Sequence, residues 1–201
     1  MNDDRCANEQ KSERVTAPNI GTPLRPIASS MRAASTGVSH FLDQVLCPIF
    51  DRVARQTTFV NGINLVRRLE LHQDLGYLTP TTTFVTFDVA ALYTMIPRDG
   101  ALIVLEEFLC KYAQNGLIHG MTIDTLMNMT SSVLDTNCFV YENKYYQQIR
   151  GGAVGSPFAM TLANIYMLKW KQRLIGNQKR HNELYGRYID DVFMTSNLSL
   201  D

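Results

Sequence analysis

Two adjacent aspartates, Asp190 and Asp191, constrain the fold of this chain more than any other feature. Apolar side chains flank the pair, with Ile189 before it and Val192 after it. This pattern predicts a strand, a tight turn and a second strand over residues 187–194, with the acids at the tip. Neighbouring carboxylates repel each other, and a divalent cation bound by hard oxygen ligands commonly compensates that repulsion. The alternative interpretation is a solvated Asp-Asp turn that binds nothing.

A third carboxylate, Asp88, favours the metal-binding interpretation. It follows residues 82–87 (TTFVTF), which are rich in β-branched and aromatic side chains and therefore predict a strand. An acid at the end of one strand, close to the acid-bearing turn of a neighbouring strand, is what two-metal phosphoryl transfer requires. In such a site, shared carboxylates bridge two ions roughly 3.5–4 Å apart.

Three segments of the chain resemble motifs A, B and C of a reverse transcriptase, and they occur in that order. They are residues 87–97 (FDVAALYTMIP), residues 151–157 (GGAVGSP) leading into 162–167 (LANIYM), and residues 188–191 (YIDD). Their amino-acid sequences resemble the Penelope-like retroelement branch more than the retroviral branch. The Penelope-like branch is related to telomerase. Three motifs in order are a specific signal, whereas each alone would be weak.

The resemblance implies an RNA-directed DNA polymerase that acts on an RNA template with a DNA primer and on deoxynucleoside triphosphates. Nucleotidyl transfer would use two Mg²⁺ ions, for which Mn²⁺ could substitute. Two other hypotheses stay open at this point. One is a catalytically inactive remnant that folds and binds nucleic acid, and the other is a telomerase-type or intron-type reverse transcriptase.

The resemblance also implies the metal ligands. Asp88 and Asp190 are the preferred ligands, and Asp191 is the third acid. Because neighbouring residues on a strand point to opposite faces, we expect Asp191 to be the less direct ligand. The backbone carbonyl of Val89 would complete the shell of one ion.

Nucleotide and template contacts follow from the same resemblance. Arg25 suits the triphosphate because its planar guanidinium can hold two phosphate oxygens at once. The ring of Tyr93 would clash with a 2′-hydroxyl and so select deoxynucleotides, although without the resemblance it would be a core aromatic. Glycines let the backbone approach a ligand closely. The implied nucleotide-binding residues are Arg25, Tyr93, Gly152 and Gly155, and the implied template/primer-binding residues are Gly151, Ser156, Pro157 and Tyr188.

The order of predicted elements indicates the α+β class. Apolar spacing predicts helices over 38–55, 63–75, 102–116, 123–137 and 157–169, and a hairpin over 138–149, with Pro48 as a candidate interruption of the first helix. Strand, helix, helix, hairpin, helix, hairpin fits a polymerase palm, in which helices back one face of an antiparallel sheet and the other face is left for a duplex and metals. We expect partial fingers and no thumb.

Two segments are expected along the chain: a poorly ordered leader over 1–20 and a partial reverse transcriptase domain over 21–201 that ends just after motif C. This would make the chain a truncated gene copy or a partial gene model. With a formal net charge of +0, overall charge does not bear on a nucleic-acid role. The 4 cysteines form no zinc-type spacing and fit a reducing compartment.

No apolar run reaches the roughly 18 residues that a membrane-spanning helix needs, and the first residues are too polar for a signal peptide. We therefore expect a soluble intracellular protein without a membrane partner. Nuclear residence would suit a retroelement polymerase, although Lys and Arg form no long cluster. The sequence leaves the oligomeric state open.

Overall fold

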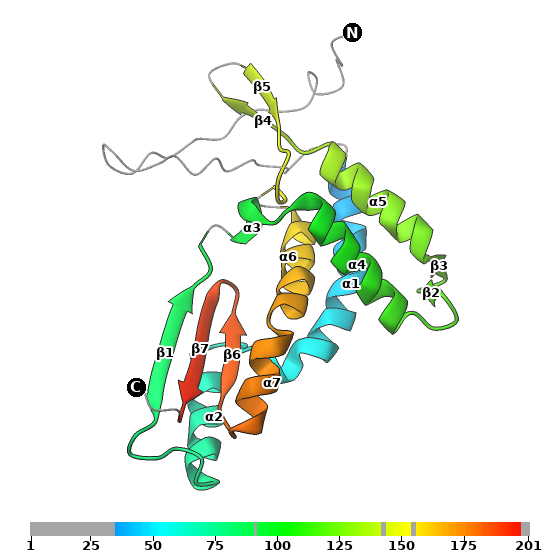
Figure 1. Ribbon diagram of the computed structural model, residues 1–201. Helices are drawn as coiled ribbons and strands as arrows, with labels where there is room; N and C mark the ends of the chain where they lie inside the picture. Colours follow the sequence, from blue (N-terminus) through cyan, green and yellow to red (C-terminus); the bar gives the residue numbers. More distant parts are fainter. Residues whose placement is uncertain (1–34, 91, 142–143, 154–155, 198–201) are drawn as a thin grey trace. The chain divides into compact units, whose positions relative to one another are not determined.

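The computed structural model describes residues 35–90, 92–141, 144–153 and 156–197 (Figure 1). The expected leader therefore lies outside the described residues. The described chain forms two compact units, one made of 35–49 and 93–166 and the other of 50–92 and 167–197. Among the described helices, α1 (Thr36–Ala54), α3 (Leu92–Met95) and α6 (Pro157–Trp170) contribute residues to both units. No helix of the described residues is both long enough and apolar enough to cross a membrane.

The first unit is mostly helical. Besides parts of α1 and α6 it contains α4 (Arg98–Tyr112), α5 (Ile123–Asp135), the short α3 (Leu92–Met95), and two small hairpins, β2 (Leu117–Ile118) with β3 (Met121–Thr122) and β4 (Cys138–Tyr141) with β5 (Lys144–Gln147). Its core consists of apolar side chains from the four long helices, among them Leu42, Leu46, Leu105, Leu109, Leu126, Phe158 and Ile165. The four long helices and the 138–149 hairpin were predicted, whereas α3 and the β2–β3 pair were not.

Polar side chains of α1 hold the N-terminus of α6. The hydroxyls of Ser39 and Ser156 are 2.6 Å apart, and the amide of Phe158 donates to Ser39 Oγ at 3.3 Å. One turn further along α6, Thr161 Oγ1 donates to Asp43 Oδ1 at 2.6 Å. The first amides of a helix have no partner within that helix, and Ser39 supplies the acceptor for one of them.

The second unit contains the three-stranded antiparallel sheet. Its strands are β1 (Thr83–Asp88), β7 (Asp191–Ser196) and β6 (Tyr185–Tyr188), in the spatial order β1-β7-β6 (Figure 1). Together with the helices, this sheet confirms the predicted α+β class. Alternation along the strands places Asp88 and Thr86 on the same face as Asp191 and Phe193, and places Tyr185 and Arg187 on the opposite face.

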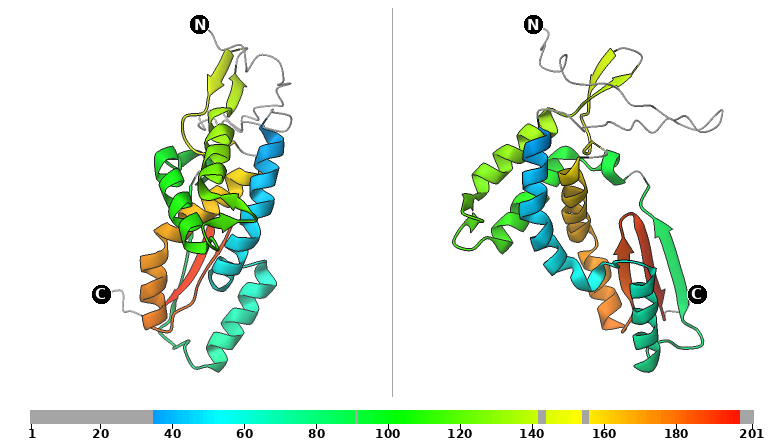
Figure 2. Two further views of the ribbon diagram at one scale, coloured as in Figure 1. Left: turned by 90° about the vertical axis from the view of Figure 1, so that its right-hand side faces the viewer. Right: turned by 180° about the vertical axis from the view of Figure 1, so that it is seen from behind.

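Helices lie on both sides of this sheet: α7 (Gln172–Arg180) on one side and α2 (Gly62–Asp74) on the other (Figure 2). On the α7 side, Gln178 Nε2 is 3.9 Å from Met194 Sδ. On the α2 side, the chain leaving the 3₁₀ helix Arg55–Thr57 places the ring of Phe59 against Gly186. The sheet therefore differs from the expected palm, in which helices cover one face only. On the α2 side, the absence of a side chain at Gly186 leaves room for the ring of Phe59.

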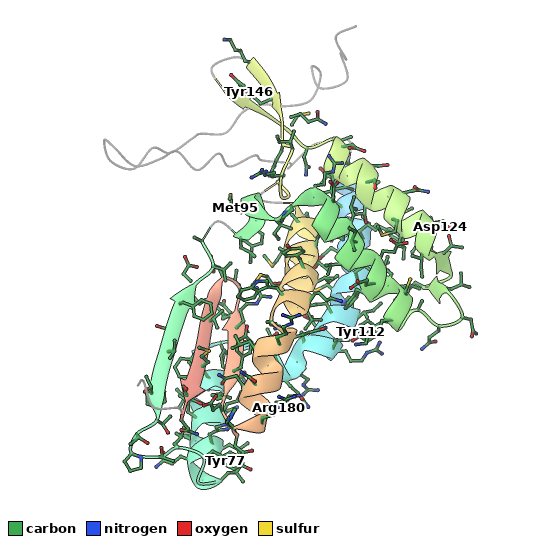
Figure 3. The ribbon with its side chains drawn as sticks, viewed as in Figure 1. Tyr77, Met95, Tyr112, Asp124, Tyr146 and Arg180 are labelled. Atoms are coloured by element: carbon green, nitrogen blue, oxygen red, sulfur yellow. The ribbon has the colours of Figure 1, made fainter. Side chains whose placement is uncertain are left out.

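Local expectations failed at two places for identifiable reasons. Pro48 does not interrupt α1, since a helix tolerates proline when its geometry is supported by packing on both sides, here by the buried Leu46 and Phe50. Helix α7 was missed because it is polar. Arg68 of α2 donates to the carbonyls of Arg55, Gln56 and Thr58 at 2.8–2.9 Å. Tyr77, labelled in Figure 3, stacks edge-on against His72 at 5.3 Å between ring centroids.

The contact between Phe59 and Gly186 generates the first prediction. A Cβ atom at position 186 would lie 2.1 Å from Phe59 Cζ and 2.2 Å from Cε2. Gly186→Ala should therefore lower the free energy of unfolding by about 1–3 kcal/mol, as overpacking of a core does. Chemical denaturation measures the change.

Gly176→Ala is the matched control, because nothing lies within 4 Å of a Cβ at that position in α7. It should stabilise the protein by about 0.5–1 kcal/mol through helix propensity. Equal effects of the two substitutions would contradict the role of Gly186.

Candidate functional site

The three acids lie together at one end of the sheet. Asp88 is directly opposite Asp191 in the β1–β7 register, and Tyr188 is opposite Asp191 in the β6–β7 register. Ile189 and Asp190 form the two-residue turn between β6 and β7. The amide of Val89 donates to the carbonyl of Asp190 at 2.9 Å, so the chain after β1 is bonded directly to this turn. The strand–turn–strand predicted over 187–194 is confirmed, with Asp190 in the turn and Asp191 at the start of β7.

The turn is strained at Ile189, whose φ is 54°. Two-residue hairpin turns with positive φ at the first position normally have glycine, asparagine or aspartate there. A β-branched residue in this region is an outlier, with a cost on the order of 1–3 kcal/mol. The rest of the fold must therefore hold Ile189 in place, and such strain is characteristic of functional sites.

A groove of about 660 Å³ begins at the acids and runs between the sheet and the start of α2. Aromatic and aliphatic side chains form most of its wall, and the carboxylates of Asp88 and Asp191 are its charged groups. Its lining includes Phe59, Leu65, Phe87, Asp88, Tyr188, Asp191 and Phe193. The ring of Phe193 packs edge-on against Phe59, at 6.4 Å between ring centroids, and in a tilted arrangement against Phe84, at 6.0 Å, which fixes the groove floor. An apolar groove with a few convergent polar groups is typical of a ligand site.

The donor set at the acids suits a divalent cation such as Mg²⁺. Among the described residues, Asp88 and Asp191 form no ion pair, and both side chains are exposed. No three or more His, Cys, Asp or Glu side chains in the described ranges gather closely enough to form a metal site by themselves. Mg²⁺ is commonly held by one or two carboxylates together with substrate phosphates, so the facing pair fits it, whereas an all-protein cage is not present in this part of the chain.

Two buried cations lie on the opposite face of the same sheet. Arg187 on β6 is 2% exposed and donates from Nη1 to the carbonyl of Ile189. Lys171, between α6 and α7, has no exposed surface, and its Nζ donates to Thr57 Oγ1 at 3.0 Å and lies 5.5 Å from the centroid of the Tyr185 ring. Burial and, secondarily, the charge of Arg187 lower the pKa of Lys171 to about 7. Burial also raises the pKa of Tyr185.

The motif B segment belongs to the first unit, where it is bonded to the residues that follow Asp88 along the chain. The amide of Gly152 donates to the carbonyl of Tyr93, and that of Gly151 to the carbonyl of Ile96, both at 2.9 Å. A Cβ at position 152 would lie 2.7 Å from the Cβ of Ala159 in α6, so close packing requires glycine there. Gly151 has a φ of 64°, which also favours glycine.

The predicted site residues are thus divided between the two units. The second unit brings together Asp88, Val89, Tyr188, Asp190 and Asp191, and the first brings together Tyr93, Gly151 and Gly152 with Ser156 and Pro157 nearby on the chain. Arg25 and Gly155 lie outside the described residues. Sequence analysis missed Phe59, Lys171 and Arg187. No pattern marked the two cations as buried, because Lys and Arg are ordinarily surface residues.

The arrangement of helices and strands identifies a class of fold but does not by itself identify an activity. No protein-family model matches the sequence, and no curated protein does. The fold is similar to solved telomerase structures. Apo telomerase from Candida tropicalis, truncated from its C-terminal domain, matches with a TM-score of 0.61 and 11% sequence identity over 82% of this chain and 34% of that one. Telomerase from Candida albicans, in complex with a TWJ fragment of telomeric RNA, matches with a TM-score of 0.60 and 13% identity over 81% and 30%.

The protein therefore has a reverse-transcriptase-like fold that resembles part of telomerase. The chain spans about a third of the length of these structures. Sequence identity this low shows the fold alone, so the activity of those proteins does not transfer with the fold.

The facing carboxylates generate a prediction about stability. Like charges directly opposite each other in a sheet are destabilising by about 0.2–1 kcal/mol. Asp191→Asn should therefore raise the free energy of unfolding by an amount of this order in EDTA and low salt. In about 1 M salt the gain should shrink, because the Debye length falls to about 3 Å. Asp74→Asn, which alters an exposed acid at the end of α2, is the control and should show no such gain.

The buried lysine generates a pH prediction. Between about pH 7 and about pH 10 the unfolded Lys171 amine is protonated, whereas the folded amine is neutral. Since the unfolded state then binds more protons, stability should rise with pH across this window and be flat just below it. Denaturation at pH 6, 8 and 9.5 should show this rise relative to Lys171→Met. Lys169→Met, which removes an exposed lysine two residues away, should keep the wild-type pH dependence.

Proposed function

We propose that the protein is the core of an RNA-directed DNA polymerase domain, which adds deoxynucleotides to a DNA primer on an RNA template. One observation carries the proposal: the β1–β7 register that sets Asp88 opposite Asp191, beside a strained turn that contains Asp190, within a reverse-transcriptase-like fold. In this proposal the sheet and its helices are the palm, and part of the first unit belongs to the fingers.

Asp88, Asp190 and Asp191 would hold the divalent cations, with the carbonyl of Val89 as a further ligand. When bound, Mg²⁺, or Mn²⁺ in its place, supplies Lewis acidity toward the attacking primer oxygen and the leaving pyrophosphate. The motif resemblance ranks Asp190 above Asp191 as a ligand, whereas the register gives Asp191 the position facing Asp88. The ranking of the two stays a prediction.

The remaining assignments rest on the motif resemblance. Arg25, Tyr93, Gly152 and Gly155 would contact the incoming nucleotide. Gly151, Ser156, Pro157 and Tyr188 would contact template and primer. Tyr188 is the member of this set that borders the groove, and its half-exposed ring (46%) suits stacking against a base or sugar.

A second candidate is the inactive remnant. It is favoured by the absence, within the described residues, of a group of three or more metal-ligating side chains.

The evolutionary origin of the chain is a separate question from its activity. The motif wording supports a Penelope-like element, while the similarity to the two Candida structures equally supports a telomerase-type polymerase.

Primer extension tests the proposal. With Mg²⁺ and an RNA template annealed to a labelled DNA primer, the wild-type chain should extend the primer. Asp88→Asn and Asp190→Ala should each lower the rate by at least about a hundredfold, because each removes a metal ligand from the transition state. Denaturing gels measure the products.

Asp74→Asn serves again as the matched acid, since it lies in the same unit but does not border the groove. It should extend at the wild-type rate. If the wild-type chain binds the primed template but does not extend the primer, the remnant would be favoured. A wild-type rate in Asp88→Asn would contradict the site assignment.

A further inference from the structure

Arg187 occupies an unusual position for an arginine. Among the described residues it is the largest fully buried side chain, and it lies on the sheet face opposite the acids. Its Nη1 donates to the carbonyl of Ile189, two residues further along the chain. Its own carbonyl accepts from the amide of Phe59 at 2.9 Å, so the backbone at 187 is fixed as well. A guanidinium out of water is costly unless it is hydrogen-bonded, so its bond to this turn needs an explanation.

The hydrogen bond from Arg187 holds the carbonyl of Ile189, the strained residue of the turn. Ile189 has a φ of 54°, and its carbonyl belongs to the peptide that leads into Asp190. The next carbonyl, that of Asp190, accepts from the amide of Val89. Both consecutive carbonyls of the turn are therefore held: one by the side chain of Arg187 and the other by the chain after β1. Arginine suits this task because its charge persists when buried and its planar group points donors in fixed directions.

We propose that Arg187 is a positioning residue. From the buried face of the sheet it holds the Ile189–Asp190 peptide in its strained conformation, and thereby keeps Asp190 and Asp191 beside Asp88. This inference rests on the proposed function for its catalytic consequence. Its structural part, the control of the turn, stands on the two hydrogen bonds and the positive φ.

Amide hydrogen exchange tests the structural part without metal or nucleic acid. The Val89 amide reports the turn, because it donates to Asp190. The Thr195 amide, which donates to the carbonyl of Leu184 at 2.9 Å at the other end of the β6–β7 hairpin, reports the rest of the sheet. In Arg187→Met, exchange at Val89 should accelerate by at least about tenfold more than at Thr195. Equal acceleration at both amides, or none at Val89, would overturn the inference.

Three further variants keep the test decisive. Arg187→Lys retains the charge but not the planar donors, and should show the same selective acceleration if Arg187→Met does not fold. Ile189→Gly removes the strain, because glycine adopts positive φ freely, so Arg187→Met with Ile189→Gly should recover protection at Val89. Lys171→Met removes the neighbouring buried cation without altering the turn and should leave Val89 protected. Failure of the glycine rescue would show that Arg187 does not act through the strain.

The catalytic part is measured separately by primer extension. Arg187→Met should lower kcat and weaken the apparent Mg²⁺ affinity, with little change in KM for the primed template, and Ile189→Gly should restore both. If the wild-type chain extends no primer, the proposed function fails while the exchange result still decides the role of Arg187 in the turn. A selective exchange effect with an unchanged kcat would overturn the catalytic role.

Discussion

The pairing register of β1 with β7 is the constraint on which the candidate site depends. Side chains alternate between the two faces of a strand, so a slip of one residue would move Asp88 to the α7 side and leave Asp191 opposite Phe87 or Val89. The bond from Val89 to Asp190 pins one end of this register, and the stacking of Phe84 on Phe193 supports it along the strand. The sheet thus sets two like charges opposite each other and holds them there by packing elsewhere.

The ring of Phe59 connects this register to the groove. It lies in the space left by Gly186, stacks on Phe193 and carries the guanidinium of Arg68 at 5.1 Å from its centroid. Arg68 in turn bonds the carbonyls at the end of the 3₁₀ helix, so the segment before α2 is fixed to the sheet. The face that carries the acids is consequently partly covered, and what remains open is the groove that starts at Asp88 and Asp191.

Local sequence pattern predicted the elements and the acid cluster well, because period-two and helical spacing directly reflect burial. Asp88 and Asp191 come from strands about a hundred residues apart in the chain. The chemistry of a two-metal site and the motif resemblance linked them before the structure was known. Phe59, Lys171 and Arg187 could not be predicted. Their roles depend on tertiary contacts: Phe59 lies against a distant glycine, and the buried Lys171 contacts Thr57 and Tyr185. Propensity assigns Lys and Arg to the surface, and here packing overrides it.

The two buried cations differ in a way that explains which of them can hold the turn. Bringing them together in one buried layer disfavours both charges, and the proton is lost from the group that can release it. Lys171 can do so, and its pKa falls to about 7. An arginine does not deprotonate in proteins, so Arg187 keeps its charge and its donors at every physiological pH. Arg187, which stays charged, is bonded to Ile189. Lys171, whose charge depends on pH, is bonded to Thr57, away from the acids. Arginine at position 187 therefore makes the support of the turn independent of pH and of the protonation of its neighbour.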